Sequence, residues 1–212
     1  MKIGFPSDKN IHYDWVSLLR SYKKYVKKSS LVLEIGASSP ERTKDLAKCC
    51  HNLIGVELLA ERKPADFNNV HYITGDWQNL SKFIKITNID LAVSSNTIEH
   101  VSDDLRALNE LHKVLKPGGV ALINTPNRKR LTQSLLSKFK GETVFPYGEH
   151  IREYTENDLI NLIKRSNFRR YIIKPVVFGI HAGSLYLYLE KPPSQFRKLA
   201  NFWEIHLFKD TN

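Results

Sequence analysis

The sequence predicts a doubly wound α/β fold in which helices cover both faces of a seven-stranded, mostly parallel sheet with one antiparallel edge strand. Three observations support this prediction. Short apolar runs alternate with segments of helical periodicity along most of the 212 residues. The first apolar run ends in a glycine, and the signals of a helix start follow it at once. Two late apolar segments follow each other without a helix between them, which predicts an antiparallel hairpin at one edge of the sheet.

Seven short segments are the predicted strands. The first five are nearly continuous apolar runs, which is typical of parallel strands that are buried on both faces. They span residues 31–36, 52–57, 70–74, 89–94 and 120–124. The two late strands span residues 168–177 and 184–189 and are separated by two glycines, Gly179 and Gly183.

Helices are predicted between these strands from their periodicity and their end signals. Ser39 and Pro40 place a capping residue and a first-turn proline directly after the first strand. Residues 103–115 have helical spacing and stop at a proline and two glycines. Thr155 and Asp158 form a variant of the capping box before a helix over residues 155–166. Further helices are predicted over residues 11–28 and 131–139.

We expect one α/β domain over residues 29–190, preceded by a helical cap over residues 1–28. Residues 191–212 are predicted to form an amphipathic helical tail. Its apolar positions are Phe196, Leu199, Ala200, Trp203 and Leu207. Such a helix either packs on the domain or binds a membrane surface or a partner protein.

Composition limits the cellular setting and the classes of partner. No run of about 18 apolar residues is present, and the first ten residues do not resemble a secretory signal. Cys49 and Cys50 are adjacent, so they do not form a disulfide framework, and we expect a reduced, cytoplasmic protein. The net charge of +10 indicates either a solvated basic surface or attraction to anions such as nucleic acid or anionic lipid headgroups.

The loop after the first strand is the candidate ligand site. In open parallel sheets, ligands bind beyond the carboxyl ends of the strands, and Gly36 lets the backbone approach a ligand there. The loop lacks the three glycines of a dinucleotide site and the Gly-Lys-Ser/Thr of a P-loop. Glu57 ends the second strand 21 residues after Gly36, where a carboxylate can bind ribose hydroxyls. Asp76 and Trp77 follow the third strand, where they could hold and cover an adenine.

An ordered set of motifs resembles the class I S-adenosylmethionine-dependent methyltransferases. The resemblance covers about residues 29 to 190 and is greatest to the small-molecule group (methyltransferase types 11 and 23) that includes ubiquinone-biosynthesis enzymes. The matching motifs are Leu33 to Ala37, Glu57, Gly75-Asp76, residues 89–93, Thr97 to Val101, Val114 to Gly119, Thr125 to Asn127 and His150 to Thr155. The resemblance implies a Rossmann-like fold.

The resemblance also implies which residues bind S-adenosyl-L-methionine. The expected cofactor-binding residues are Glu34, Gly36, Ala37, Ser38, Glu57, Leu58, Asp76, Trp77, Ser95 and Asn96. Family members usually carry two or three glycines in the first motif, whereas this chain carries one. Ala37 and Ser38 must therefore keep a negative φ for the loop to adopt its usual path.

The expected reaction is in-line transfer of the methyl group to a small-molecule acceptor, which could be lipid- or sugar-linked. His150 is the candidate general base, with His100 and His12 as alternatives, and no metal site is expected. Two other interpretations stay open. An RNA methyltransferase would suit the basic charge, although no Asn-Pro-Pro-Tyr/Phe motif follows the fourth strand. A catalytically silent binding protein would suit the glycine-poor loop.

Overall fold

The structure of the protein is a computed structural model that describes residues 2–4, 13–85, 87–140, 149–182, 185–189 and 192–211. Its main sheet has seven strands in the order β4-β3-β2-β5-β6-β10-β7. The strands are β2 (Leu31–Ile35), β3 (Asn52–Glu57), β4 (Val70–Thr74), β5 (Ile89–Ser95), β6 (Leu115–Pro126), β7 (Arg170–Val176) and β10 (Phe202–Phe208). β4, β3, β2, β5 and β6 are parallel, whereas β10 is antiparallel to both β6 and β7. The predicted fold class is confirmed, and the antiparallel strand lies next to the edge strand β7.

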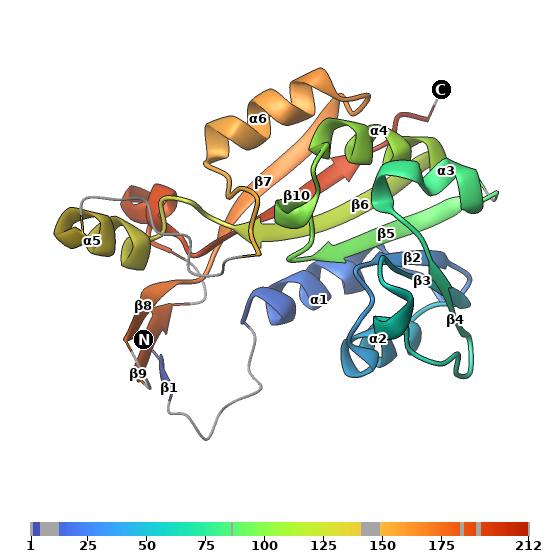
Figure 1. The fold of residues 1–212 in the computed structure, drawn as a ribbon, viewed down its shortest axis with the longest axis horizontal. Helices are drawn as coiled ribbons and strands as arrows, with labels where there is room; N and C mark the ends of the chain where they lie inside the picture. Colours follow the sequence, from blue (N-terminus) through green and yellow to red (C-terminus); the bar gives the residue numbers. More distant parts are fainter. Residues whose placement is uncertain are drawn as a thin grey trace.

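Helices cover both faces of this sheet, as predicted (Figure 1). One face carries α1 (Tyr13–Tyr25) and α2 (Pro40–Ala47), and the other carries α3 (Leu80–Phe83), α4 (Asp104–Val114) and α6 (Glu156–Arg165). α5 (Leu131–Lys140) lies beyond the edge toward which β5 points. The short 3-10 turns are η2 (Ala60–Arg62), η3 (Trp77–Asn79), η4 (Ile98–His100) and η5 (Ser194–Leu199).

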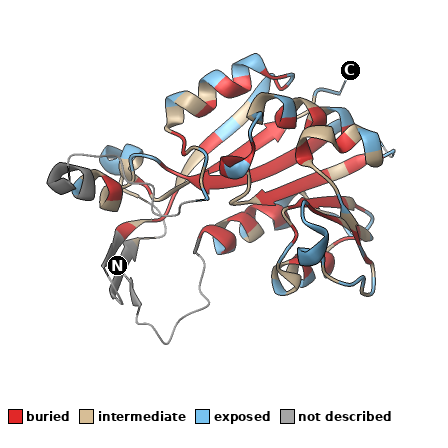
Figure 2. Ribbon diagram, viewed as in Figure 1, coloured by how far each residue is buried: buried red, intermediate tan, exposed pale blue. Residues whose placement is uncertain are grey.

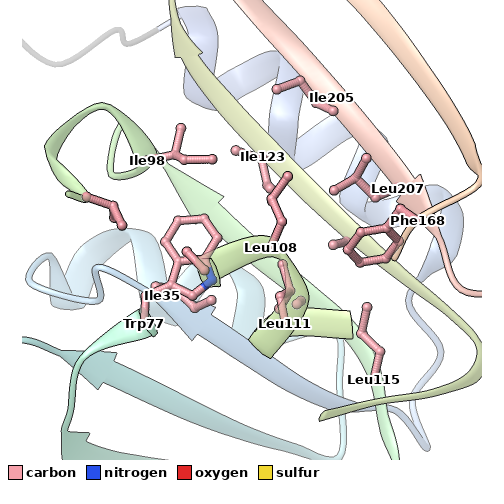
Figure 3. Packing of buried hydrophobic residues seen from close by; sticks show 14 of the residues in the cluster. Ile35, Trp77, Ile98, Leu108, Leu111, Leu115, Ile123, Phe168, Ile205 and Leu207 are labelled. Carbon is pink, nitrogen blue, oxygen red and sulfur yellow. The ribbon is translucent and has the colours of Figure 1, made fainter. Parts of the chain in front are cut away.

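Two hydrophobic layers hold the helices on the sheet. Leu108 and Leu111 of α4 pack with sheet residues such as Ile123, as Figure 3 shows. On the opposite face, Leu18 and Tyr22 of α1 belong to a second layer. The central strands are therefore buried along most of their length (Figure 2). Polar groups can reach a ligand mainly at the ends of the strands.

Local signals explain where two of the helices begin. The Thr155 hydroxyl accepts a hydrogen bond from the Asp158 backbone, and the Asp158 carboxylate accepts one from the Thr155 backbone, which completes the predicted capping box of α6. Ser39 occupies the N-cap position of α2, but its side chain makes no capping hydrogen bond. Pro40 and the dipole-compatible Glu41 therefore mark that start instead.

The prediction of a C-terminal amphipathic helix is wrong. Ser194–Leu199 form only the turn η5, and β10 pairs along its whole length with β6 on one side and β7 on the other. The side chains alternate: Trp203 enters the large hydrophobic layer, whereas Glu204 bonds to α1. A strand inside a sheet satisfies its backbone on both sides, and this pairing outweighs the helical spacing of the apolar residues. The α/β domain therefore extends to residue 208 rather than ending at residue 190.

The predicted late hairpin has different partners. β7 pairs with β10, whereas β9 (Leu185–Leu189) pairs with β8 (Phe178–Ala182) and β1 (Lys2–Gly4) in a separate three-stranded sheet. Between β7 and β8, Val177 has a φ of 59°, which is unusual for a β-branched residue and turns the chain out of the main sheet. Gly183 and Ser184 lie outside the described residues.

The predicted N-terminal helix is confirmed as α1, whereas His12 lies outside the described residues. Cys49 and Cys50 both carry free thiols. Among the helices of the described ranges, none combines the length and the apolar character that are needed to cross a membrane.

Candidate functional site

The predicted site residues meet at one edge of the sheet. Because β4, β3, β2 and β5 are parallel neighbours, their carboxyl ends lie together at the edge toward which β5 points (Figure 1). Gly36 follows β2, Glu57 ends β3, Asp76 follows β4 and Ser95 ends β5. The strand order thus brings together four positions that are distant in the sequence.

Gly36 occupies a position that only glycine tolerates. Its φ is +77°, and a Cβ atom there would lie 2.4 Å from Thr97 Oγ1. Its backbone N–H donates to Val56 O at 2.9 Å, which fixes the loop against β3. Ala37 and Ser38 are not among the described residues with positive φ, so they meet the condition that the sequence set. One glycine is therefore sufficient for this loop.

Glu34 is a buried carboxyl group at the end of β2. Its exposed fraction is 6%, and its Oε2 atom has no hydrogen-bond partner among the described residues. Burial raises the pKa of Glu34 to about 7, although a hydrogen bond with Thr43 and the charge of Arg42 oppose this shift. An unsatisfied buried oxygen is costly unless a ligand donates to it, so Glu34 fits its predicted place in a binding site.

Glu57 and Leu58 lie together at the end of β3. Glu57 is 6% exposed, and its Oε1 accepts a long hydrogen bond of 3.3 Å from the Leu59 backbone. Leu58, the next residue, is 60% exposed. A carboxylate beside an open apolar side chain suits a ribose that is joined to a flat base.

Asp76 and Trp77 have different surroundings from each other. Asp76 caps η3, and its Oδ1 accepts a hydrogen bond from Gln78 N at 2.8 Å. Trp77 is 3% exposed, and Figure 3 shows it beside Ile35 and Leu108 in the large hydrophobic layer. The surrounding core side chains leave little of the Trp77 ring open, which favours a supporting role below Asp76 over the predicted cover for an adenine.

Asn96 is held in an uncommon conformation directly after Ser95, the last residue of β5. Asn96 has a φ of 50°, and its backbone N–H donates to Asn124 Oδ1 at 3.0 Å. Its side-chain amide donates to Asp14 Oδ2 at 2.8 Å, so the first turn of α1 fixes it. Asp14 and Asn124 are both buried. Sequence analysis missed both residues, because neither belongs to a recognisable motif.

Several buried polar atoms at and near this edge of the sheet find no hydrogen-bond partner within the described parts of the chain. They are Glu34 Oε2, Ser94 Oγ, Ser95 Oγ, Asn96 Oδ1 and Asn124 Nδ2. Native proteins rarely leave such groups unsatisfied, and a group of them beside an open glycine loop indicates a polar ligand. The residues present therefore fit a nucleoside that carries hydroxyl and amino groups.

His150 lies in a second polar cluster, with Glu153 and Arg130. Its Nδ1 is 3.0 Å from Glu153 Oε1, and Arg130 binds the same carboxylate with distances of 2.5 and 3.2 Å. Glu153 is 2% exposed. A carboxylate on Nδ1 fixes the orientation and tautomer of an imidazole, as in hydrolytic triads. The sequence indicated His150, but no motif in it pointed to Glu153 or Arg130.

The loop that carries His150 is fastened to η4. The backbone N–H groups of Ile151 and Arg152 donate to Glu99 O at 3.0 and 3.2 Å. His100 of η4 lies edge-on to the His150 ring, with centroids 4.8 Å apart. η4 begins two residues after Asn96, so these contacts keep His150 close to the end of β5.

Glu99 adds a buried carboxyl group to the two histidines. Its Oε2 accepts a hydrogen bond from Thr125 Oγ1 at 3.0 Å, and burial raises the pKa of Glu99 to about 8. One ligand-type atom each from Glu99, His100 and His150 lies within 4.8 Å of the others. Two imidazoles and one carboxylate are a donor set that could hold a divalent metal ion such as zinc. The sequence did not lead us to expect such a set.

Comparisons with known proteins identify a family for the chain. A family model described as a methyltransferase domain matches residues 8–171, which is most of the chain. A probable S-adenosylmethionine-dependent methyltransferase of Mycolicibacterium smegmatis is 32% identical over 80 residues. That match covers 38% of this chain and only 28% of the relative.

Solved structures share the fold. A methyltransferase of Thermotoga maritima, described as a possible histamine N-methyltransferase, has a TM-score of 0.61 at 22% identity and covers 93% of this chain and 90% of its own. A methyltransferase of Archaeoglobus fulgidus has a TM-score of 0.65 at 16% identity, with 96% and 97% covered. At these identities the likeness concerns the fold alone. From the family model, which matches most of its length, the chain belongs to the family of methyltransferase domains.

Proposed function

We propose that the protein transfers the methyl group of S-adenosylmethionine to a small-molecule acceptor by in-line displacement, with His150 as the general base. The observation that most directly supports this proposal is the contact between the loop that carries His150 and η4, in which Ile151 N–H donates to Glu99 O at 3.0 Å. This contact supports the proposal because it holds an oriented imidazole near the end of β5, where Ser95 and Asn96 would border the cofactor.

The cofactor, when bound, supplies an activated methyl group. The chain's part is to position both reactants and to accept a proton, because correct positioning alone can lower a barrier by about 7–11 kcal/mol in favourable cases. Glu57 would bind the ribose, Leu58 and Asp76 would border the base, and Asn96 would border the methionine end. The left-handed backbone of Asn96 and its bond to Asp14 support this positioning.

His150 would take the proton from an acceptor hydroxyl or amine. Glu153 holds its Nδ1, so the other ring nitrogen, Nε2, is the atom that accepts the proton. Arg130 pairs with Glu153 and holds its carboxylate in place. Such a base contributes about 10²–10⁴-fold to a rate.

The test first requires an acceptor, which a mass-shift screen of metabolite and lipid extracts with labelled cofactor would supply. His150→Ala should then lower turnover by about 10²-fold or more, with cofactor affinity unchanged. His51→Ala is the matched control, because His51 is exposed and lies away from this edge. Normal turnover of the His150 variant would overturn the base assignment.

A chelator separates the base from a metal ligand. If His150 is the base, turnover should be the same with and without the chelator. Loss of activity that added zinc or manganese restores would instead assign Glu99, His100 and His150 to a metal ion.

A further inference from the structure

Two histidines and a buried glutamate at η4 form a group that we name the η4 cluster: Glu99, His100 and His150. One ligand-type atom from each residue lies within 4.8 Å of the others. Three points at this spacing share a centre no more than about 2.8 Å away, whereas zinc bonds to nitrogen and oxygen are about 2.0–2.2 Å long. A shift of under about 1 Å in each side chain would therefore bring the three atoms to bonding distance of one ion.

Each imidazole of the η4 cluster already has the kind of partner that orients metal-bound histidines. His100 Nδ1 lies 2.9 Å from Glu149 O, and His150 Nδ1 lies 3.0 Å from Glu153 Oε1. A carbonyl and an ionised carboxylate only accept hydrogen bonds, so Nδ1 carries the proton and Nε2 carries the lone pair of each ring. Histidines that bind metal ions donate their other N–H to a carbonyl or a carboxylate in the same way.

Glu99 supplies the oxygen of the set. It is 0% exposed, its Oε2 accepts a hydrogen bond from Thr125 Oγ1, and its Oε1 has no hydrogen-bond partner among the described residues. An unsatisfied buried carboxyl oxygen is costly, and a cation beside it would remove this cost. Burial raises the pKa of Glu99 to about 8, so an ion that binds at neutral pH would displace the proton of this group.

The donor set and its exposure favour zinc. Two nitrogens and one oxygen are three of the four ligands of a tetrahedral zinc ion, and water can take the fourth position. Magnesium and calcium prefer oxygen ligands alone. His100 is exposed, His150 is partly exposed and Glu99 is buried, so an ion would reach the carboxyl group from the side of the histidines.

We propose that Zn²⁺ binds to Glu99, His100 and His150 and inhibits methyl transfer, because the ion occupies the His150 nitrogen that otherwise accepts the proton of the acceptor. This inference rests on the proposed role of His150 as the general base. One lone pair cannot hold a proton and a zinc ion together, so the two compete. Turnover itself needs no metal ion, and zinc acts on it only as an inhibitor.

Calorimetric titration of the full chain with zinc chloride, after treatment with a chelator, tests the site without cofactor or acceptor. We expect saturable binding of one ion per chain. His100→Ala should weaken this binding by at least about tenfold, since even the loss of an outer partner of a metal ligand costs that much. Glu99→Gln keeps the shape of the side chain but removes its charge, and it should weaken the binding to a similar extent.

His71→Ala is the matched control. His71 lies on β4, outside the η4 cluster, and is an exposed histidine whose Nδ1 is 3.3 Å from Asp66 Oδ2. Zinc affinity of this variant should stay within about twofold of that of the unmodified protein, and thermal melts should show that each variant folds. Equal losses in His71→Ala and His100→Ala would mean scattered binding to surface histidines and would overturn the proposal. So would the absence of saturable binding.

Turnover measurements then test the inhibition. The rate should fall over the zinc concentrations that fill the site, and a chelator should restore the metal-free rate. His100→Ala, compared with its own metal-free rate, should need at least about tenfold more zinc for the same inhibition. Zinc binding that leaves turnover unchanged would overturn the inhibitory role, and so would a loss of turnover on chelation.

The two proposals fail in different ways. A normal rate for His150→Ala together with saturable zinc binding would refute the base, and with it the cause of inhibition, but would leave the zinc site intact. A slow His150→Ala variant in a protein that binds no zinc would refute the zinc site alone.

Discussion

Gly36 shows how much a single residue can determine at this site. Its positive φ and the 2.4 Å approach of Thr97 to the position of a Cβ leave no room for a side chain. The neighbouring Ala37 and Ser38 adopt no such conformation among the described residues. The conformation of this loop therefore does not need the two or three glycines that the family motif usually carries. What the loop requires is one glycine at the turn and small residues after it.

The buried carboxyl group of Glu34 should make the stability of the protein depend on pH. Burial raises the pKa of Glu34 to about 7 in the folded protein, above its ordinary value of 4.5. The folded state thus binds this proton more tightly than the unfolded chain. The resulting stabilisation is complete below about pH 4.5 and is lost as the pH rises through about 7.

We therefore expect the free energy of unfolding, measured without cofactor, to fall between about pH 5 and about pH 8. The titration of Glu34 should account for up to about 3 kcal/mol of this fall. Glu34→Gln keeps the shape of the neutral acid and cannot ionise, so its curve should lack this fall. Urea denaturation of both proteins across that pH range measures the difference. Parallel curves would show that Glu34 titrates near its ordinary pKa.

At the scale of elements, the sequence predicted best where its signal was local. The strands β2 to β5 and residues 120–124 of β6 are short apolar runs, and Thr155 with Asp158 is a capping pattern that can be read directly. The structure extends β6 back to Leu115, through the proline and two glycines that the sequence predicted as a helix stop. Residues 202–208 also carried a local signal, because Trp203, Ile205 and Leu207 alternate with polar residues. The longer helical spacing that begins at Phe196 concealed this period of two.

The partners of the site residues could not be predicted, since they are contacts across the fold. Asp14 and Asn96 are 82 residues apart, and Thr97 meets Gly36 only after β5 pairs with β2. The contact between His150 and Glu153 is the most local of these contacts, because the two residues are only three positions apart. Nothing in the sequence, however, says that this spacing would bring the two side chains together in a loop.

The place of β10 between two strands predicts the effect of truncation. A chain that ends at Leu199 loses the strand that joins β6 to β7, which leaves backbone groups unpaired and one side of the hydrophobic layer open. We expect no cooperative thermal unfolding of this variant by circular dichroism. A chain that ends at Asp210 retains all of β10 and should melt like the full chain. A sharp, normal melt of the shorter chain would contradict the observed topology.

At the scale of the whole molecule, the proposed cofactor site depends on both hydrophobic layers at once. α1 holds Asn96 through Asp14 from one face, while the η4 segment that carries Glu99 belongs to the other. The site is thus assembled only when both helical layers are docked on the sheet. Cofactor binding should therefore stabilise the whole fold and not merely one loop, because a ligand that binds only the folded state shifts the global equilibrium.

Thermal unfolding with and without S-adenosylmethionine tests this coupling and separates a working site from a catalytically silent one. At a cofactor concentration about 100 times its dissociation constant, binding adds about 2.7 kcal/mol to the free energy of unfolding. This corresponds to a rise in Tm of about 5–10 °C for a domain of this size.

Gly36→Ala should abolish this rise, because the Cβ atom of the alanine would clash with Thr97. Gly118→Ala is the control. The φ of Gly118 is +74°, so an alanine there suffers similar backbone strain, but its Cβ would only touch Thr211, at 3.4 Å. Gly118 lies before residue 120, far along β6 from the strand ends that carry the proposed cofactor site. That variant should start from a lower Tm and still show the full rise. If neither the unmodified protein nor Gly118→Ala responds to the cofactor, the fold has lost its ligand, and the protein is a binding scaffold with the shape of a methyltransferase.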